Sequence, residues 1–404
     1  MKVIIYLIKT MTPNLPFIFV ISLLACCIEV DISVPSFPDI SDYFNISDGL
    51  TQMTIAINFL GFCLSSVVYG PLSDCYGRRN VMLIGNAIML VGAIFCVFAN
   101  SIELLLLSRF VQGFGASTSA VVVFAMIADV YETDKAAKLI GVMNSLITVF
   151  MSVAPIAGGF INGLVGFRGN YLVIALVALM SWLVLYFKLP ETKKVKETLQ
   201  IRTILKNFRL LITDKRVLYA SLAPSVTYSG YMSFIACAPF LYMETYNLPI
   251  MYYAINQGII ISIFSIFSMY SGCISTYFGE RLCVIYGTIL LFLGGVFGLF
   301  VGLVFPKSPL LTTSFMTTYA IGAAITYPII FAKSLDIFPN IKGTASSSIM
   351  ATRSLLCALF IAFTSYIYDG TLLNVSLGLL LSSLLTVFFT FRLLKLIGFA
   401  TKNN

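Results

Sequence analysis

The sequence predicts an all-α membrane protein, and three observations lead to that fold class. The chain of 404 residues is 59% hydrophobic, and its mean hydropathy is +0.97. Only 10% of its residues are charged, whereas a soluble domain carries about 25%. Apolar stretches of about 20 residues, the length that crosses a bilayer, recur along the chain. Continuous runs of this length form helices in lipid, because a helix satisfies its own backbone groups.

The apolar stretches number twelve and fall into two groups of six. The first group is predicted at residues 14–36, 49–70, 81–99, 104–128, 136–161 and 170–188. The second group is predicted at residues 217–240, 252–276, 283–304, 309–332, 343–367 and 373–396. We therefore expect an N-terminal six-helix half at 1–188, a basic linker at 189–216 and a C-terminal six-helix half at 217–404. Residues 198–212 of the linker have the spacing of an amphipathic helix on a membrane surface.

The placement of lysine and arginine predicts the orientation. If both termini are cytoplasmic, all but four of the 25 basic residues fall in the termini, inner loops, inner span ends and linker. The four exceptions are Arg109, Arg168, Lys307 and Arg353. This asymmetry is typical of a multi-pass protein with cytoplasmic termini, and it explains the net charge of +8 without nucleic acid. The N-terminus resembles a signal peptide but lacks an evident cleavage site, so we interpret it as the first span.

Residue types exclude several classes of protein. The chain has no histidine, and its nine cysteines form no CxxC pair. We expect neither a metal site nor a disulfide framework, and the cysteines are interpreted as small apolar residues. No catalytic cluster is visible, so we expect no enzyme. No GxxxxGK[ST] sequence is present, which argues against an ATP site.

Two pairs of similar sequence segments predict that the halves are repeats of each other. GPLSDCYGRR at 70–79 and GCISTYFGER at 272–281 share one pattern, 202 residues apart. DVYETDK at 129–135 and DIFPNIK at 336–342 share a second pattern, 207 residues apart. Parallel repeats of six spans are a transporter architecture.

Several motifs of the sequence resemble those of the major facilitator superfamily. GPLSDCYGRRNVMLIG (70–85) resembles its loop signature, SRFVQGFGAS (108–117) its fourth-helix motif, and APIAGGFI (154–161) the fifth-helix motif of proton-driven antiporters. DISVPSFPDI (31–40) and LPET (189–192) resemble the Bcr/CmlA drug-resistance subfamily. The resemblance implies the major facilitator fold, with twelve transmembrane helices in two six-helix repeats around a central cavity.

The loop signature is a candidate conformational latch. Gly70 and Gly77 are expected to permit a tight turn, and Arg78 and Arg79 to hold the loop at the inner surface. Asp74 is expected to pair with Arg78 or to face the N-terminus of span 11 near residues 343–346, so that the two halves are latched in one state. The second copy has Thr276 in place of this aspartate. The alternative is that the loop only fixes the topology.

The fifth-helix motif predicts a close helix contact. Gly158 and Gly159 let a neighbouring helix approach closely, and Pro155 is expected to bend the helix. Such a contact seals the protein against proton leakage, although ordinary helix packing uses the same residues.

Candidate coupling residues lie within the spans. Glu29 and Asp31 end the first apolar run, and Arg109 in span 4 needs an anionic partner at that depth. Asp31 matches the subfamily position and is predicted to carry the proton with Arg109 as its partner, whereas Glu29 is interpreted as an extra acid. Both acids could instead be surface residues, and Arg109 could reach the outer surface. Pro35 and Pro38 are expected to open the helix beside them and to expose its backbone to a water-filled cavity.

Other polar and aromatic residues are predicted to line the substrate cavity. Gln112 follows Arg109 on the same helix face, and Asn58 lies at a similar depth in span 2. Arg353 could hold a substrate anion or a structural carboxylate. Three aromatic residues of span 7 could line a drug cavity or simply pack: Tyr228, Tyr231 and Phe234.

The predicted function is proton-driven efflux of small, partly apolar drugs across the bacterial inner membrane. The alternative is a proton-coupled symporter that imports a nutrient or osmolyte, which the fifth-helix motif disfavours. The proton gradient would supply the energy, so no cofactor is expected. The expected partners are the small-molecule substrate, protons and membrane lipid, without nucleic acid, and the protein is expected to be a monomer.

Overall fold

The computed structural model describes residues 15–131, 133–193, 209–211, 213–337 and 342–398. Its first half contains α2 (Leu15–Ser33), the 3₁₀ turn η1 (Val34–Ser36), α3 (Phe37–Phe44), α4 (Asp48–Tyr76), α5 (Arg78–Val97), α6 (Ile102–Val130), α7 (Thr133–Val165) and α8 (Phe167–Lys188). Its second half contains α10 (Lys215–Phe240), the π turn η2 (Leu241–Thr245), α11 (Ile250–Phe278), α12 (Glu280–Val304), α13 (Pro309–Asp336), α14 (Lys342–Ile367) and α15 (Leu372–Leu396).

Twelve long helices in the described part of the chain match the twelve predicted spans. Eleven of these segments are apolar and long enough to cross a membrane. The twelfth, α10, has 26 residues and buries polar side chains along its length, including Ser221, Ser225 and Ser229. It crosses the bundle interior, which explains its greater polarity. The predicted amphipathic helix of the linker lies largely outside the described residues.

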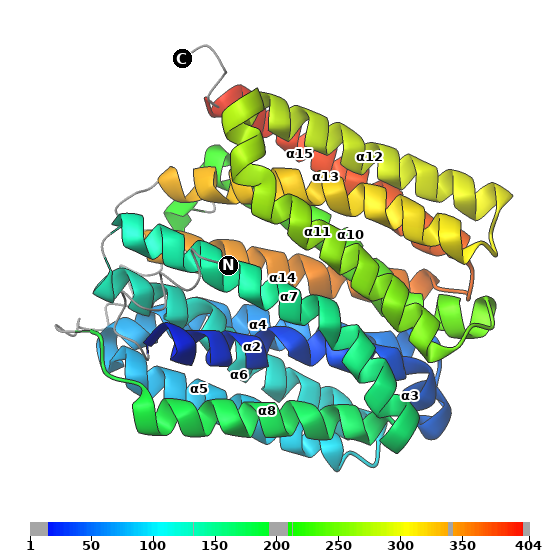
Figure 1. Ribbon diagram of the computed structural model, residues 1–404, viewed down its shortest axis with the longest axis horizontal. Coiled ribbons are helices and arrows are strands. Elements are labelled where there is room, and N and C mark those ends of the chain that lie inside the picture. Colours follow the sequence, from blue (N-terminus) through cyan, green and yellow to red (C-terminus); the bar gives the residue numbers. More distant parts are fainter. Residues whose placement is uncertain (1–14, 132, 194–208, 212, 338–341, 399–404) are drawn as a thin grey trace.

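The helices of the two halves lie roughly parallel to one another (Figure 1). Two pairs of helices join the halves along their length, α4 with α14 and α7 with α11. The helices α5 and α8 form one flank of the molecule, and α12 and α15 form the other (Figure 1). The elements nearest the middle are therefore α2, α4, α7, α10, α11 and α14.

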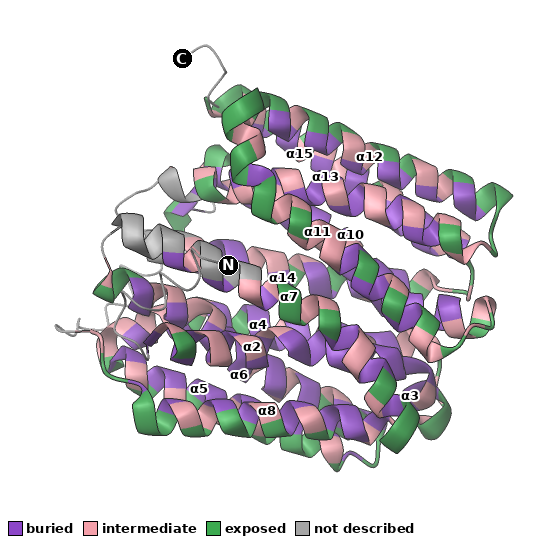
Figure 2. Cartoon of the chain, in the orientation of Figure 1, coloured by how far each residue is buried: buried purple, intermediate pink, exposed green. Residues whose placement is uncertain are grey.

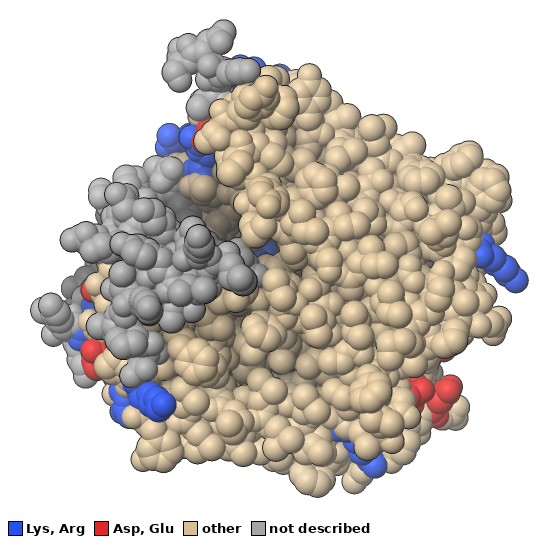
Figure 3. Space-filling model, viewed as in Figure 1, with Lys and Arg blue, Asp and Glu red and all other residues tan. Residues whose placement is uncertain are grey.

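The outward faces of the helices are apolar. Exposed positions run along the outer sides of α8 and α12 (Figure 2), and many carry large hydrophobic side chains such as Phe187, Leu183, Leu293 and Phe300. Figure 3 shows charged side chains near the two ends of the helices, with an almost uncharged surface between them. An uncharged band of this kind is suited to contact with lipid. The chain is a multi-pass membrane protein.

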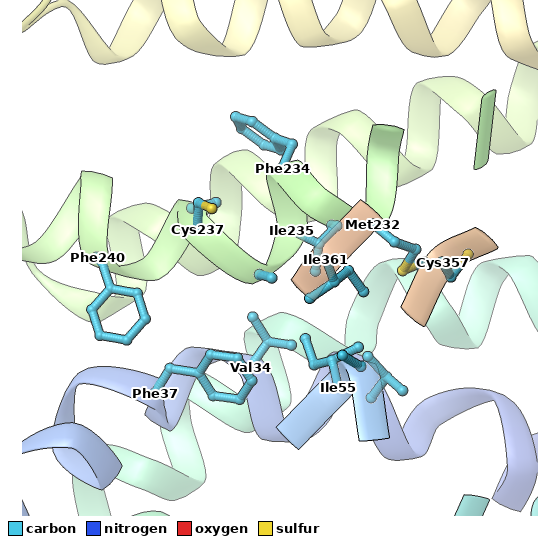
Figure 4. Packing of buried hydrophobic residues seen from close by; sticks show 14 of the residues in the cluster. Val34, Phe37, Ile55, Met232, Phe234, Ile235, Cys237, Phe240, Cys357 and Ile361 are labelled. Atoms are coloured by element: carbon cyan, nitrogen blue, oxygen red, sulfur yellow. The ribbon is translucent and has the colours of Figure 1, made fainter. Parts of the chain in front are cut away.

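We call the side with the described linker residues 189–193 the linker side, and the side with Asn45, Gly166 and Gly370 the opposite side. Towards the opposite side, buried apolar residues of both halves form one cluster. Figure 4 shows Val34, Phe37 and Ile55 of the first half facing residues of the second. The rings of Phe37 and Phe240 have centroids 6.4 Å apart. The halves are thus closed against each other at this side.

Candidate functional site

The two carboxyl groups of α2 lie inside the protein. Glu29 is 2% exposed and Asp31 is 3% exposed. The helix ends two residues after Asp31, where Pro35 enters the turn η1, because proline lacks the N–H that an α-helix needs. The interpretation of these acids as surface residues is therefore wrong.

The prolines were expected to expose loosened backbone to water, and this expectation is also wrong in its detail. The hydroxyl of Ser33 donates to the carbonyl of Val30 at 2.9 Å, and that of Ser36 donates to the carbonyl of Ser33 at 2.6 Å. Serine side chains thus satisfy carbonyl groups at the break, and the whole turn η1 is buried. The end of α2 is therefore buried, and serine side chains bind its carbonyl groups.

Arg109 forms the centre of a buried polar cluster. Its side chain is completely buried, and its Nη1 atom lies 4.0 Å from Oε2 of Glu29. The same Nη1 donates to Oε1 of Gln112 at 2.9 Å. The amide of Asn58 donates to Oε1 of Glu29 at 3.3 Å and to the Arg109 carbonyl at 3.2 Å. The cluster therefore joins α2, α4 and α6 through one ion pair and its hydrogen bonds.

Glycines of the fourth-helix motif allow this cluster to form. A Cβ atom at Gly113 would overlap the backbone carbonyl of Asn58, and one at Gly115 would overlap the backbone of Met89. The two glycines let α6 contact α4 and α5 at backbone distance. The arginine and glutamine of the motif are positioned by this close approach.

The predicted pairing of Asp31 with Arg109 is wrong, since the ion pair forms with Glu29. Asp31 lies two residues further along α2, which turns its side chain by about 200° around a helix of 3.6 residues per turn. Its carboxyl group lies within electrostatic range of tyrosines in the second half, namely Tyr228, Tyr231 and Tyr253. None of the described residues forms an ion pair or hydrogen bond with the Asp31 carboxyl group.

The second half contributes an aromatic and polar surface opposite Asp31. The side-chain amide of Gln257 on α11 donates to the hydroxyl of Tyr231 at 2.9 Å. Tyr228 contacts Phe59 of α4 edge-on, with ring centroids 6.4 Å apart, and therefore bridges the halves. Of the two alternatives for Phe234, cavity lining or packing, the structure shows packing. Phe234 is 1% exposed, packs against Phe315 and points away from the first half (Figure 4).

The loop signature forms a charged cluster on the linker side. Nη2 of Arg78 lies 2.7 Å from Oδ1 of Asp74, and its Nε lies 3.0 Å from Oδ2 of Asp129 on α6. Lys193 of the linker also contacts Asp74, at 3.2 Å. The predicted pair of Asp74 with Arg78 is confirmed. The other expected partner, the start of span 11, falls mostly at residues 343–345, whose side chains are not described.

Glu191 of the LPET sequence binds the N-terminus of α5. Its two carboxylate oxygens accept hydrogen bonds from the backbone N–H groups of Arg78 and Arg79, at 3.0 and 3.2 Å. An anion is favoured there because the first N–H groups of a helix lack internal partners. The Arg79 side chain donates to the carbonyls of Leu189 and Tyr186. The signature loop is thus tied to the start of the linker.

The two glycines of the signature have different roles. Gly77 adopts φ 97° and ψ 145° between α4 and α5, so the turn needs glycine there. Gly70 was also expected in the turn, and that expectation is wrong. It lies within α4, where a Cβ atom would sit 3.1 Å from the hydroxyl of Ser347 on α14. Gly70 therefore supports the contact between the halves.

The second copy of the loop keeps the turn and changes the charges. Gly279 has φ 85° and ψ 144°, close to the values of Gly77. Thr276, in place of the aspartate, donates to the carbonyl of Cys273 in its own helix. Glu280 occupies the position of Arg78 and pairs with Lys333 of α13 at 2.9 Å. The second half thus has a bridge of reversed charge between the equivalent helices.

The fifth-helix motif lies between the halves. A Cβ atom at Gly158 would overlap the backbone of Ile32 on α2, and one at Gly159 would lie 3.2 Å from the side chain of Ala254 on α11. The two glycines thus face different helices, one in each half. Pro155 lies inside α7, which continues to Val165. The close contact predicted from the motif is present beside Asp31.

The sequence did not predict some residues of these clusters. It predicted others without identifying the residues that they contact. Glu191 was predicted only as part of the LPET sequence (189–192). An acid that follows α8 is nevertheless well placed to bind the N-terminus of a neighbouring helix. The bridge between Glu280 and Lys333 was not predicted, because Glu280 replaces an arginine of the signature and its partner lies on another helix. In the part of the chain that the structure describes, no group of three His, Cys, Asp or Glu side chains has the arrangement of a metal site.

Comparison with known proteins places the chain in a family. The family model of the Major Facilitator Superfamily matches residues 19–361. A bicyclomycin resistance protein homolog of Haemophilus influenzae is 29% identical over 338 residues, with 80% of this chain and 82% of that protein covered. Multidrug resistance protein MdtM of Escherichia coli is 22% identical over 329 residues, with 80% of each chain covered.

Solved structures agree on the fold. The partially occluded inward-open structure of the xylose transporter XylE from E. coli superposes with a TM-score of 0.75, covers 97% of this chain and 98% of that chain, and is 14% identical. At that identity the likeness concerns the fold alone. With the matching family model over most of its length, the chain belongs to the Major Facilitator Superfamily and is a membrane transporter, not an enzyme.

Proposed function

We propose that this protein exports small, partly apolar compounds across the bacterial inner membrane in exchange for protons. The names of its relatives, a bicyclomycin resistance homolog and a multidrug resistance protein, support export of drugs. The asymmetry of its basic residues supports a cytoplasmic location for both termini. Under this orientation the linker side faces the cytoplasm and the closed opposite side faces outwards.

One observation carries the proposal: the two buried carboxyl groups of α2 have different surroundings. Glu29 has a cationic partner, Arg109, and a hydrogen bond from Asn58. Asp31 has neither among the described residues, yet it is 3% exposed. A buried charge is costly unless it is paired. Asp31 is therefore suited to hold a proton while no substrate is bound, and to release that proton when water or a cationic group of the substrate arrives.

The transport cycle that follows uses the two acids differently. In the outward-facing state Asp31 takes a proton from outside. After the change to the inward-facing state, the substrate binds beside Asp31 and the proton leaves to the cytoplasm. Arg109 keeps Glu29 in place throughout, so that only one carboxyl group of α2 changes its charge. The Gly158 contact keeps α7 tight against α2 beside this site, which limits proton leakage.

The experiment that tests this function measures drug accumulation in inverted membrane vesicles from cells that express the protein. A proton gradient, acidic inside, is expected to drive accumulation of drugs such as ethidium, and collapse of the gradient is expected to stop it. Vesicles from cells without the protein are the control. Export is refuted if the drug leaves inverted vesicles together with protons, which would indicate the importing symporter.

The role of Asp31 is tested with Asp31→Asn and a matched control, Asp42→Asn. Asp42 is an exposed acid eleven residues further along the same half. We expect the Asp31 variant to insert normally and to lose proton-driven accumulation, while the Asp42 variant keeps it. Normal proton-driven transport by the Asp31 variant contradicts the assignment.

A further inference from the structure

Arg353 is a second basic residue within the membrane-spanning bundle, and its surroundings differ from those of Arg109. It lies on α14 and is partly buried. Its Nη1 atom donates to the hydroxyl of Tyr327 on α13 at 2.9 Å. Its Cζ atom lies 4.9 Å from the centroid of the Tyr228 ring on α10. Three helices of the second half thus fix the position of this guanidinium group.

The described residues provide no carboxylate for Arg353. No aspartate or glutamate oxygen among them lies within 4.0 Å of its guanidinium group, and its Nε atom is buried without a hydrogen-bond partner. By contrast, Arg109 has Glu29 and Arg78 has two aspartates. An arginine within a membrane is costly and normally has an anionic partner. A neutral tyrosine hydroxyl and a ring face only partly replace one.

Arg353 also lies close to the place where the two halves meet. The Tyr228 ring that it contacts packs edge-on against Phe59 of α4, in the first half. The same tyrosine is within electrostatic range of Asp31. An unpaired base of the second half therefore contacts this aromatic side chain, and an unpaired acid of the first half lies within electrostatic range of it. A cation and an acid near one aromatic surface are complementary to a small aromatic zwitterion.

We propose that Arg353 binds the acidic group of the transported compound, with the aromatic body against Tyr228 and the amino group towards Asp31. Small aromatic zwitterions are then preferred over aromatic cations that lack an acidic group. The direction of transport rests on the function proposed above, whereas the binding of the acid by Arg353 does not. A planar guanidinium group can donate two parallel hydrogen bonds to a carboxylate, and Nε, now without a partner, is one of the available donors.

The test is equilibrium binding to the purified full-length protein in detergent, without a proton gradient. Ciprofloxacin is a suitable probe, because its aromatic ring system carries a carboxylate at one end and an amine at the other. Its methyl ester removes the negative charge, and its N-acetyl derivative removes the positive charge. A hydrogen-bonded charge contributes about 1.5–3 kcal/mol, so the wild-type protein is expected to bind the acid at least about tenfold more tightly than the ester.

Variants assign each preference to one residue. In Arg353→Gln the acid and the ester are expected to bind within about twofold of each other, while the preference for the amine over its N-acetyl form remains. In Asp31→Asn the reverse is expected. Arg353→Lys keeps a cation and is expected to keep a weaker preference for the acid. Arg392→Gln, which removes an exposed arginine of α15, is the matched control and should bind all three compounds as the wild type does.

Several outcomes overturn the proposal. Wild-type protein that binds none of the three compounds, or binds the acid and the ester equally, overturns the substrate class. An unchanged acid preference in Arg353→Gln overturns the role of Arg353. If Arg353→Gln does not fold, Tyr327→Phe removes the hydroxyl that positions the guanidinium, and an acid preference unaffected by that change counts against the site. Failure of proton-driven transport with intact acid preference would refute only the transport function.

Discussion

Removal of the charge at Glu29 is expected to destabilise the protein, because Arg109 would remain buried without its ionic partner. The two charged atoms are 4.0 Å apart, and both side chains are almost inaccessible to solvent. At an effective dielectric constant of 20, two unit charges at this distance attract by about 4 kcal/mol. Loss of one partner of a buried pair typically costs about 3–5 kcal/mol, which agrees. Scaled to a chain of this length, the change is on the order of 5 °C in Tm.

The assay is thermal unfolding of purified protein in detergent, followed with a dye that fluoresces on reaction with thiols. The chain suits this method because buried cysteines such as Cys26, Cys96 and Cys237 become reactive only on unfolding. We expect Glu29→Gln and Arg109→Gln each to lower Tm, and the double variant to lower it by less than their sum. A Glu29→Gln variant that melts like the wild type, or strictly additive losses, would refute the buried ion pair.

Three further predictions concern the helix contacts. Gly158→Ala is expected to cost about 1–3 kcal/mol of stability and to impair transport, because its new methyl group overlaps the backbone of α2. Gly163→Ala is the control, since a Cβ atom there would meet nothing within 4 Å. The control should be close to neutral in a thermal melt and in vesicle transport. Asp214→Ala removes the N-cap of α10 and should cost about 1 kcal/mol. The hydrogen bond from the arginine two residues later holds the pKa of Asp214 below its usual value. The stabilisation by this cap should therefore be present at neutral pH and lost as acidification protonates the carboxylate. A wild-type-to-variant difference in Tm that grows below pH 4 would contradict this. Glu280→Lys or Lys333→Glu alone should lower Tm slightly, and the double reversal should restore it. A double variant that melts no higher than the single variants would contradict this.

Much of the fold could be predicted from the sequence because lipid restricts the choices. A run of 20 apolar residues has one good solution, a helix, and twelve such runs fix the class of the fold. The turn at Gly77 was predictable as well, since its backbone angles favour glycine. Helix ends were less predictable, because α4 and α6 continue through polar residues beyond the apolar runs.

The partners within the site were harder to predict than its members. Glu29, Asp31, Arg109, Asn58 and Gln112 were all selected from the sequence, and the structure places four of them in one cluster. The choice between two acids depends on the rotation of α2, and a pattern in one chain does not fix that rotation. Resemblance favoured Asp31 as the partner of Arg109, whereas the geometry gives Glu29. The unpaired state of Arg353 likewise depends on distances between helices far apart in sequence.

Proton release on substrate binding tests most directly whether Asp31 carries the coupled proton. Purified protein in weakly buffered detergent solution is mixed with a transported drug, and a pH indicator records the protons released. Proton release is expected from the wild type and from Asp42→Asn, and none from Asp31→Asn under conditions where that variant still binds the drug. Equal proton release by Asp31→Asn and the wild type would contradict the claim that Asp31 carries the coupled proton.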